Sequence, residues 1–93
     1  MNLTPPIFQV GNIIRDWKGN FYKVYHVQKE TWGNTLHCKL IMNKHYEPKN
    51  GRVMRQFSGG SLVDKSVLDD LRIGTRKAYQ KQLDALDILE KLV

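Results

Sequence analysis

The stretch Val10–Val27 reads VGNIIRDWKGNFYKVYHV and contains two apolar-rich runs on either side of a tight-turn sequence. The first run, residues 12–17, supplies β-branched and aromatic side chains, and the second, residues 21–27, supplies Phe, Tyr and Val. Residues 18–20 between them read Lys-Gly-Asn, and glycine and asparagine tolerate the positive φ values that tight turns require. We therefore expect a β-hairpin, around which the rest of the chain is organised.

Two further strands are predicted after this hairpin. Apart from Ile41, residues 35–44 alternate between apolar and polar side chains, as does a strand with one buried face. The residues expected on the apolar face are Leu36, Cys38, Leu40 and Met42. A Gly-Asn pair marks the connection at residues 30–34 as a turn, and a proline with an Asn-Gly pair marks residues 45–52 as a loop. Residues 53–57 form the fourth expected strand, which two glycines end.

The sequence changes its period after residue 60. Residues 61–74 mix apolar and acidic side chains, which predicts a connecting segment with a short strand or a single helical turn. Thr75 is a suitable N-cap, and residues 76–93 have the pattern of an amphipathic helix. Its apolar stripe comprises Tyr79, Leu83, Leu86, Leu89 and Val93. This stripe must pack on the strands or on a second copy, so a homodimer through the helix is an open alternative.

Length and composition indicate one domain. With 93 residues, of which 41% are hydrophobic, the chain has room for one modest core, so we expect residues 1–93 to form a single domain. No apolar run approaches the roughly 20 residues of a membrane span, and the N-terminus lacks the regions of a secretory signal. The single cysteine, Cys38, excludes an intrachain disulfide and agrees with a reducing compartment. We therefore expect a soluble, cytoplasmic protein.

Four or five short strands followed by a terminal helix resemble the small SH3-like barrels, a group that includes KOW and Tudor domains. The residues that carry the resemblance are Val10-Gly11-Asn12-Ile13-Ile14, Gly19 and Tyr22-Lys23-Val24. The resemblance implies a mainly β fold with α: a small SH3-like antiparallel β-barrel at residues 7–60, followed by a C-terminal amphipathic helix at residues 75–93. The helix is not part of the minimal barrel.

The net charge of +6 comes entirely from the predicted strands and their loops. Residues 1–60 contain nine lysines and arginines but only three acidic residues, whereas residues 61–93 contain six of each. All three histidines and every aromatic residue except Tyr79 also lie in the first of these segments. A basic, aromatic-rich half of this kind favours an anionic partner.

Nucleic acid is the partner that this combination favours, because lysine and arginine neutralise phosphates while exposed aromatic rings stack on bases. We predict a non-enzymatic protein that contacts DNA or RNA phosphates with little sequence specificity. The expected nucleic-acid-binding residues are Arg15, Trp17, Lys23, Trp32, His37, Lys39, Lys44, Tyr46, Lys49, Arg52 and Arg55. The aromatic residues interpreted instead as core are Phe21, Tyr22, Tyr25 and Phe57.

Two other classes of function compete with this prediction. The first is a small protein-binding module or inhibitor, of the kind that a phage or mobile element encodes, which would dock on an acidic host protein. The second is an enzyme or metalloprotein. Cys38 lies on the apolar face of its strand, and adjacent residues such as Asp69 and Asp70 point apart, so neither predicts catalysis. The three histidines, His26, His37 and His45, lack metal-ligand spacing, and we expect neither a metal nor a cofactor.

Overall fold

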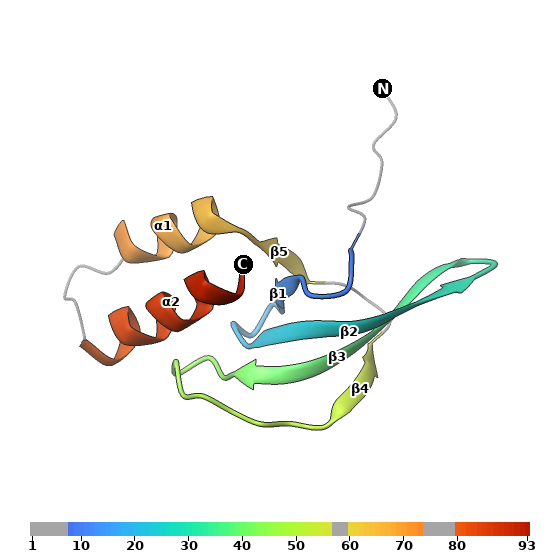
Figure 1. The fold of residues 1–93 in the computed structure, drawn as a ribbon, viewed down its shortest axis with the longest axis horizontal. Coiled ribbons are helices and arrows are strands. Elements are labelled where there is room, and N and C mark those ends of the chain that lie inside the picture. Colours follow the sequence, from blue (N-terminus) through green and yellow to red (C-terminus); the bar gives the residue numbers. More distant parts are fainter. Residues whose placement is uncertain (1–7, 57–59, 74–79) are drawn as a thin grey trace.

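The computed structural model describes residues 8–56, 60–73 and 80–93 and shows a five-stranded antiparallel sheet followed by two helices (Figure 1). The strands are β1 (Ile13–Arg15), β2 (Phe21–Glu30), β3 (Gly33–Met42), β4 (Val53–Gln56) and β5 (Ser61–Val63), and the helices are α1 (Lys65–Ile73) and α2 (Gln80–Leu92). The strand order is β4-β3-β2-β1-β5, so the last strand returns to pair with the first. Among these strands β4 has only β3 as a neighbour, and the sheet is not closed into a barrel.

The predicted hairpin is present, and Asp16 organises its turn. Residues of β1 pair with β2 in antiparallel register, and Gly19 has the positive φ, 95°, that the turn requires. The Asp16 carboxylate accepts hydrogen bonds from the backbone N–H of Lys18 (3.0 Å) and of Asn20 (2.9 Å), and also from the Tyr22 hydroxyl (3.1 Å). A short polar side chain that satisfies the backbone donors of the following residues is the usual device of such turns.

Register shifts interrupt the long β2–β3 ladder at two places. Phe21 pairs with Met42, but Tyr22 pairs with Leu40, so Ile41 is an additional residue on β3. The second shift lies between Val24 and His26 and makes Tyr25 an additional residue on β2. Such bulges change the face to which the following side chains point and increase the local twist of the strands.

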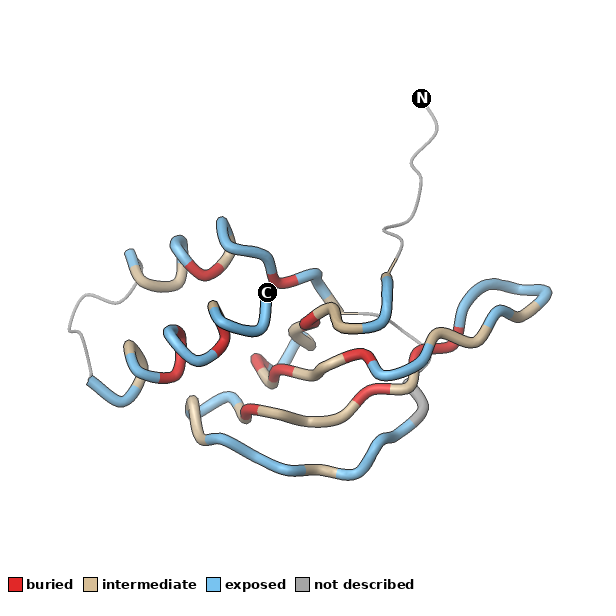
Figure 2. The backbone as a smooth tube through the Cα atoms, in the orientation of Figure 1, coloured by how far each residue is buried: buried red, intermediate tan, exposed pale blue. Residues whose placement is uncertain are grey.

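The two faces of the sheet carry separate buried clusters. In the first cluster, residues of β1, β2, β3 and β5 pack against the helices; its members are Ile13, Phe21, Met42, Val63, Leu68, Ala85, Leu86 and Leu89. The second lies on the opposite face and consists of Ile14, Val24, Leu36 and Cys38, with Phe8 packed against it. The prediction that Met42 shares a face with Leu36 and Cys38 is therefore wrong, because the bulge at Ile41 reverses the alternation. Figure 2 shows the buried residues in the central strands and on the inner sides of both helices.

The segment after residue 60 is more regular than the sequence predicted. It contains both a strand, β5, and a nine-residue helix, α1, where we expected a connecting segment with either a short strand or a single helical turn. Asp64 caps α1, because its carboxylate accepts hydrogen bonds from the Val67 N–H (3.0 Å) and the Ser66 hydroxyl (2.8 Å), and these bonds lower the pKa of Asp64. The amphipathic helix is present as α2, whereas its expected N-cap, Thr75, lies outside the described residues.

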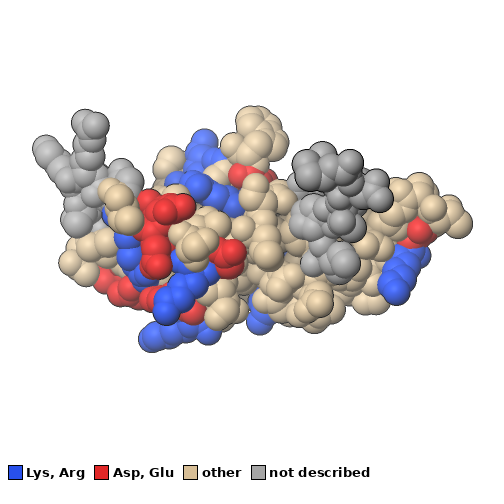
Figure 3. Space-filling model, turned by 90° about the horizontal axis from the view of Figure 1, so that it is seen from above, with Lys and Arg blue, Asp and Glu red and all other residues tan. Residues whose placement is uncertain are grey.

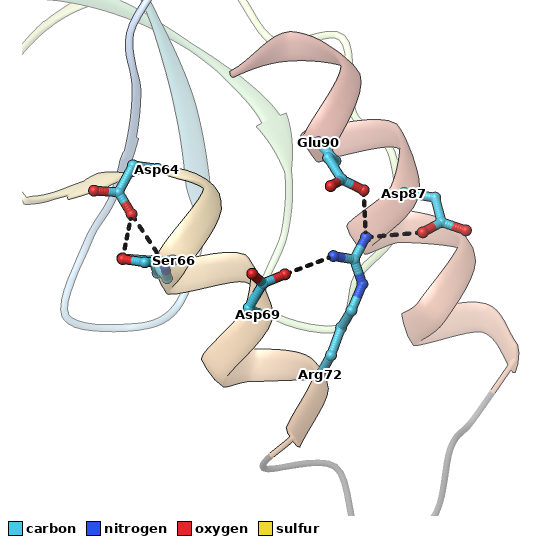
Figure 4. A network of polar contacts seen from close by, with 7 residues as sticks. Asp64, Ser66, Asp69, Arg72, Asp87 and Glu90 are labelled. Atoms are coloured by element: carbon cyan, nitrogen blue, oxygen red, sulfur yellow. Dashed lines mark hydrogen bonds and ion pairs between the residues drawn. The ribbon is translucent and has the colours of Figure 1, made fainter.

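A single guanidinium joins the two helices. Arg72 of α1 contacts Asp69 on its own helix at 3.2 Å, and it reaches across to Asp87 (2.9 Å) and Glu90 (2.8 Å) of α2 (Figure 4). The hydrogen bonds to Glu90 and Asp87 raise the pKa of Arg72. Together with the buried Leu68, Leu86 and Leu89, this network fixes α1 and α2 as a hairpin over one face of the sheet.

Candidate nucleic-acid interface

The helices leave part of the sheet exposed, and two predicted binding residues meet there. Lys23 of β2 lies directly opposite Lys39 of β3. Tyr25 lies between them: the ammonium of Lys23 is 5.6 Å from the centre of the Tyr25 ring, and that of Lys39 is 6.0 Å away. Tyr25 is 44% exposed, so its ring is accessible from solvent while both cations approach it. An aromatic surface flanked by two positive charges results.

Two histidines extend this arrangement along the same strands. His26 pairs with His37 across β2 and β3, and the centres of their rings are 5.2 Å apart. His37 Nε2 is 3.1 Å from Oε1 of Gln28, an oxygen that can only accept, so Nε2 donates this hydrogen bond. We define the sheet patch as Lys23, Tyr25, His26, His37 and Lys39. It offers three rings and two permanent positive charges over a short stretch of two neighbouring strands.

Strand β4 borders the sheet patch. Val53 pairs with Lys39, and Arg55 pairs with His37, so the backbone of β4 brings a third basic position to the patch. Val53 is 50% exposed. Arg52, which directly precedes β4, is exposed as well.

Carboxylates do not neutralise the sheet patch within the described residues. The ion pairs in this part of the chain join Arg72 to Asp69, Asp87 and Glu90, and Lys81 to Glu47 at 3.7 Å. Lys23 and Lys39 take part in none of them. Figure 3 shows basic and acidic groups intermixed at the end of the molecule that the helices form. The structure thus separates a helical end, where acids and bases are paired, from a sheet patch whose two lysines form no ion pair with the described residues.

Three other predicted residues lie at the β1–β2 turn instead. The guanidinium carbon of Arg15 is 5.2 Å from the centre of the Phe21 ring, and Trp17 in the turn is 89% exposed. Lys44 joins the turn from the other side, because its backbone N–H donates to Asn20 Oδ1 at 2.9 Å. These residues lie around the turn that joins β1 to β2, so they form a group separate from the sheet patch.

The remaining predicted residues are dispersed. Trp32 is 62% exposed at the tip of the β2–β3 hairpin, about 20 Å along the strand from Lys39 at the usual rise per residue. Tyr46 lies in the predicted loop but packs against the first cluster, with its ring centre 6.0 Å from that of Phe21. Lys49 is exposed in the same loop. The eleven predicted residues therefore do not form one continuous surface.

Sequence reasoning missed two members of the sheet patch, Tyr25 and His26. From the sequence we expect Tyr25 in the core, although Tyr25 lies two residues beyond Lys23 and so belongs to the same face of a regular strand. This spacing was the available signal. The bulge at Tyr25, which lets His26 pair with His37 on that face, has no comparable signature in the sequence.

The chemistry of the other candidate groups is limited. Cys38 is 1% exposed in the second cluster, and burial raises the pKa of its thiol to about 11. Such a thiol is a poor nucleophile. Within residues 8–56, 60–73 and 80–93, no group of three or more His, Cys, Asp or Glu side chains is arranged to hold a metal ion. In the same segments, neither helix combines the length and apolar character needed to cross a membrane.

Comparison of the chain with known protein families, with curated proteins and with solved structures gives no match.

Proposed function

We propose that this protein binds single-stranded nucleic acid on the sheet patch, with little sequence specificity. The observation that carries the proposal is the placement of Lys23 and Lys39 opposite each other, with the half-exposed ring of Tyr25 between them. Like charges directly opposite on neighbouring strands destabilise a sheet. A phosphate bound between the two ammonium groups removes this repulsion, so the arrangement suits an anionic ligand.

The rings favour a single strand over a duplex. Stacking on Tyr25, His26 or His37 needs bases that are not already stacked in a helix. Duplex recognition through base edges usually needs a helix or ribbon in a groove. Helix α2 is unsuited to that role, because Leu86 and Leu89 are fully buried against the sheet and its charged residues are three acids and two lysines. Contacts to phosphates and stacked bases are tolerant of sequence.

We also propose that the sheet belongs to a small SH3-like barrel. Two features support it: β5 returns to pair with β1, and register shifts occur at Tyr25 and Ile41. Bulges of this kind bend strands, and barrels use them to close. Nuclear Overhauser effects between the backbones of β4 and β5 test closure directly. Their absence from a well-resolved spectrum would exclude a barrel.

A fluorescence-anisotropy titration of the Lys23→Gln/Lys39→Gln variant tests the function. With a single-stranded oligonucleotide, we expect binding at least about tenfold weaker than that of the unaltered protein, because two phosphate contacts are lost. The slope of log affinity against log salt should fall by about 1–2. The matched control is Lys65→Gln/Lys91→Gln, which removes the same charge from exposed positions on the helices and should change the affinity little.

Two outcomes would contradict the proposal. Equal weakening in both double variants would show that only net charge matters and that the sheet patch is not a site. If the unaltered protein binds no nucleic acid at low salt, the proposal is wrong. The alternative is then that the basic surface binds an acidic protein, which a pull-down would test.

A further inference from the structure

A pocket lies at the β1–β2 turn, away from the sheet patch. It is a cavity of about 440 Å³, lined by turn residues 15–19, by Ser61 and Val63 of β5, and by Val67 of α1. We call it the turn pocket. The turn supplies two cations and an aromatic ring to this pocket, and β5 supplies a hydroxyl, so its polar groups come from segments far apart in the sequence.

Arg15 carries a positive charge that the described residues leave without a counterion. Its guanidinium lies over the Phe21 ring, and its Nε atom is buried with no hydrogen-bond partner. In the described part of the chain Arg15 forms no ion pair. A guanidinium has five N–H donors, and a buried donor without an acceptor costs free energy. The buried Nε is out of reach of a ligand, but Arg15 lines the turn pocket, so an anion there can accept hydrogen bonds from the terminal nitrogens of its guanidinium.

The neighbouring residues strengthen the positive character of the turn pocket. Lys18 Nζ is 5.2 Å from the centre of the Trp17 ring, so a cation and a large aromatic surface are adjacent. The only acid in the lining, Asp16, already accepts four hydrogen bonds, from the backbone N–H of Lys18 and Asn20, the Asn20 amide and the Tyr22 hydroxyl. Because these bonds direct its charge into the turn, Asp16 does not compete effectively for Arg15.

We infer that the turn pocket binds a nucleotide, with its phosphate between Arg15 and Lys18 and its base stacked on Trp17. The ring of Trp17 is 89% exposed, which leaves room for a base. A phosphate oxygen accepts charge-assisted hydrogen bonds from both cations, and base stacking on an aromatic ring adds affinity without sequence specificity. This inference rests on the proposed function, because a single strand bound to the sheet patch would bring one of its nucleotides to the turn pocket. A free nucleotide has the same phosphate and base.

Tryptophan fluorescence tests this site separately from the sheet patch. The Trp32→Phe background leaves Trp17 as the only tryptophan. In it, we expect adenosine monophosphate to quench the emission and adenosine to bind at least about tenfold more weakly, since adenosine lacks the phosphate. Lys18→Gln should weaken the nucleotide about tenfold, whereas Lys29→Gln, exposed on the distant part of β2, should leave it unchanged.

The outcomes separate the two possible sources of the phosphate. Equal affinity for adenosine monophosphate and for a short 5′-phosphorylated single strand supports a free-nucleotide site, and much tighter binding of the strand supports a strand-end site. Quenching by adenosine as strong as by the nucleotide, no quenching by either ligand, or an unchanged affinity in Lys18→Gln would overturn the inference. If Lys23→Gln/Lys39→Gln leaves oligonucleotide binding intact, the proposed function fails while the nucleotide titration still decides on the turn pocket.

Discussion

Asp16 shows how much of this fold depends on a single side chain. Burial acts to raise the pKa of its carboxyl, but hydrogen bonds from Asn20, Tyr22 and Lys18 outweigh burial and leave the pKa below the ordinary value of 3.8. A carboxyl group whose pKa is lower in the folded protein than in the unfolded chain stabilises the fold when ionised. This stabilisation is complete above the ordinary pKa and disappears as the pH falls through the folded value.

We therefore expect the Asp16→Asn variant to be less stable by about 1–2 kcal/mol at pH 7, because a charged acceptor of several hydrogen bonds is lost. The difference from the unaltered protein should shrink as the pH falls below about 4. Urea unfolding between pH 7 and pH 2.5 measures both quantities. Asp70→Asn, which removes the same charge from an exposed position on α1, is the control. A difference that is independent of pH would contradict the assigned role of Asp16.

Gly60 illustrates a residue whose role the sequence could not reveal. The sequence pattern indicates only that Gly60 belongs to a pair of glycines that ends a strand and forms a turn. A Cβ at this position would lie 2.6 Å from the carbonyl carbon of Arg15 and would collide with the oxygen as well, so β5 can approach β1 only with glycine here. Proximity to a backbone 45 residues away leaves no mark in the local sequence.

At the scale of elements, the apolar stripe of α2 was predicted to pack either on the strands or on a second copy of the chain. Leu86 and Leu89 are fully buried in the first cluster with Phe21 and Met42, so the stripe packs within its own chain. The exposed large apolar residues of this helix are Ile88 and Leu92, which are 46% and 42% exposed. A homodimer through the apolar side chains of α2 would therefore have to use Ile88 and Leu92 instead of the buried leucines.

The Leu86→Ala variant should lose about 2–5 kcal/mol of unfolding free energy, because it leaves a cavity between the helix and the sheet. The matched change on the outer side, Leu92→Ala, should cost no more than about 0.5 kcal/mol. Denaturant unfolding followed by circular dichroism measures both values. Similar losses in the two variants would mean that α2 does not pack as described.

An element can be predicted from the sequence when residues close to one another in the sequence determine it. The β1–β2 hairpin, strand β3 and helix α2 could be predicted, because turn residues and periodic apolar side chains specify them within a few positions. The bulges at Tyr25 and Ile41 could not, because they depend on pairing between strands. For the same reason Lys23 and Lys39 were both predicted as binding residues, yet their direct opposition and the ring between them were not.

At the scale of the whole molecule, the boundary between the sheet and the helices is also a boundary in charge. The helices contain paired acids and bases around Arg72, while the sheet keeps the positive excess that the sequence predicted for residues 1–60. An approaching polyanion would be attracted to the sheet end and not to the helical end. The polyanion would therefore meet the sheet patch and the basic residues bordering it first.

The strand order also has a kinetic consequence. Strands β2 and β3 are joined by a tight turn, whereas Arg15 of β1 pairs with Ser61 of β5 across 46 positions of sequence. Closing a long loop costs more chain entropy than forming a hairpin. We expect amides of β2 and β3 to become protected before those between β1 and β5 in pulsed hydrogen-exchange refolding, and simultaneous protection would contradict this order. Until β5 docks, the free edge of β1 is open to other chains, so the growing polypeptide is most prone to aggregate before residue 63 has left the ribosome.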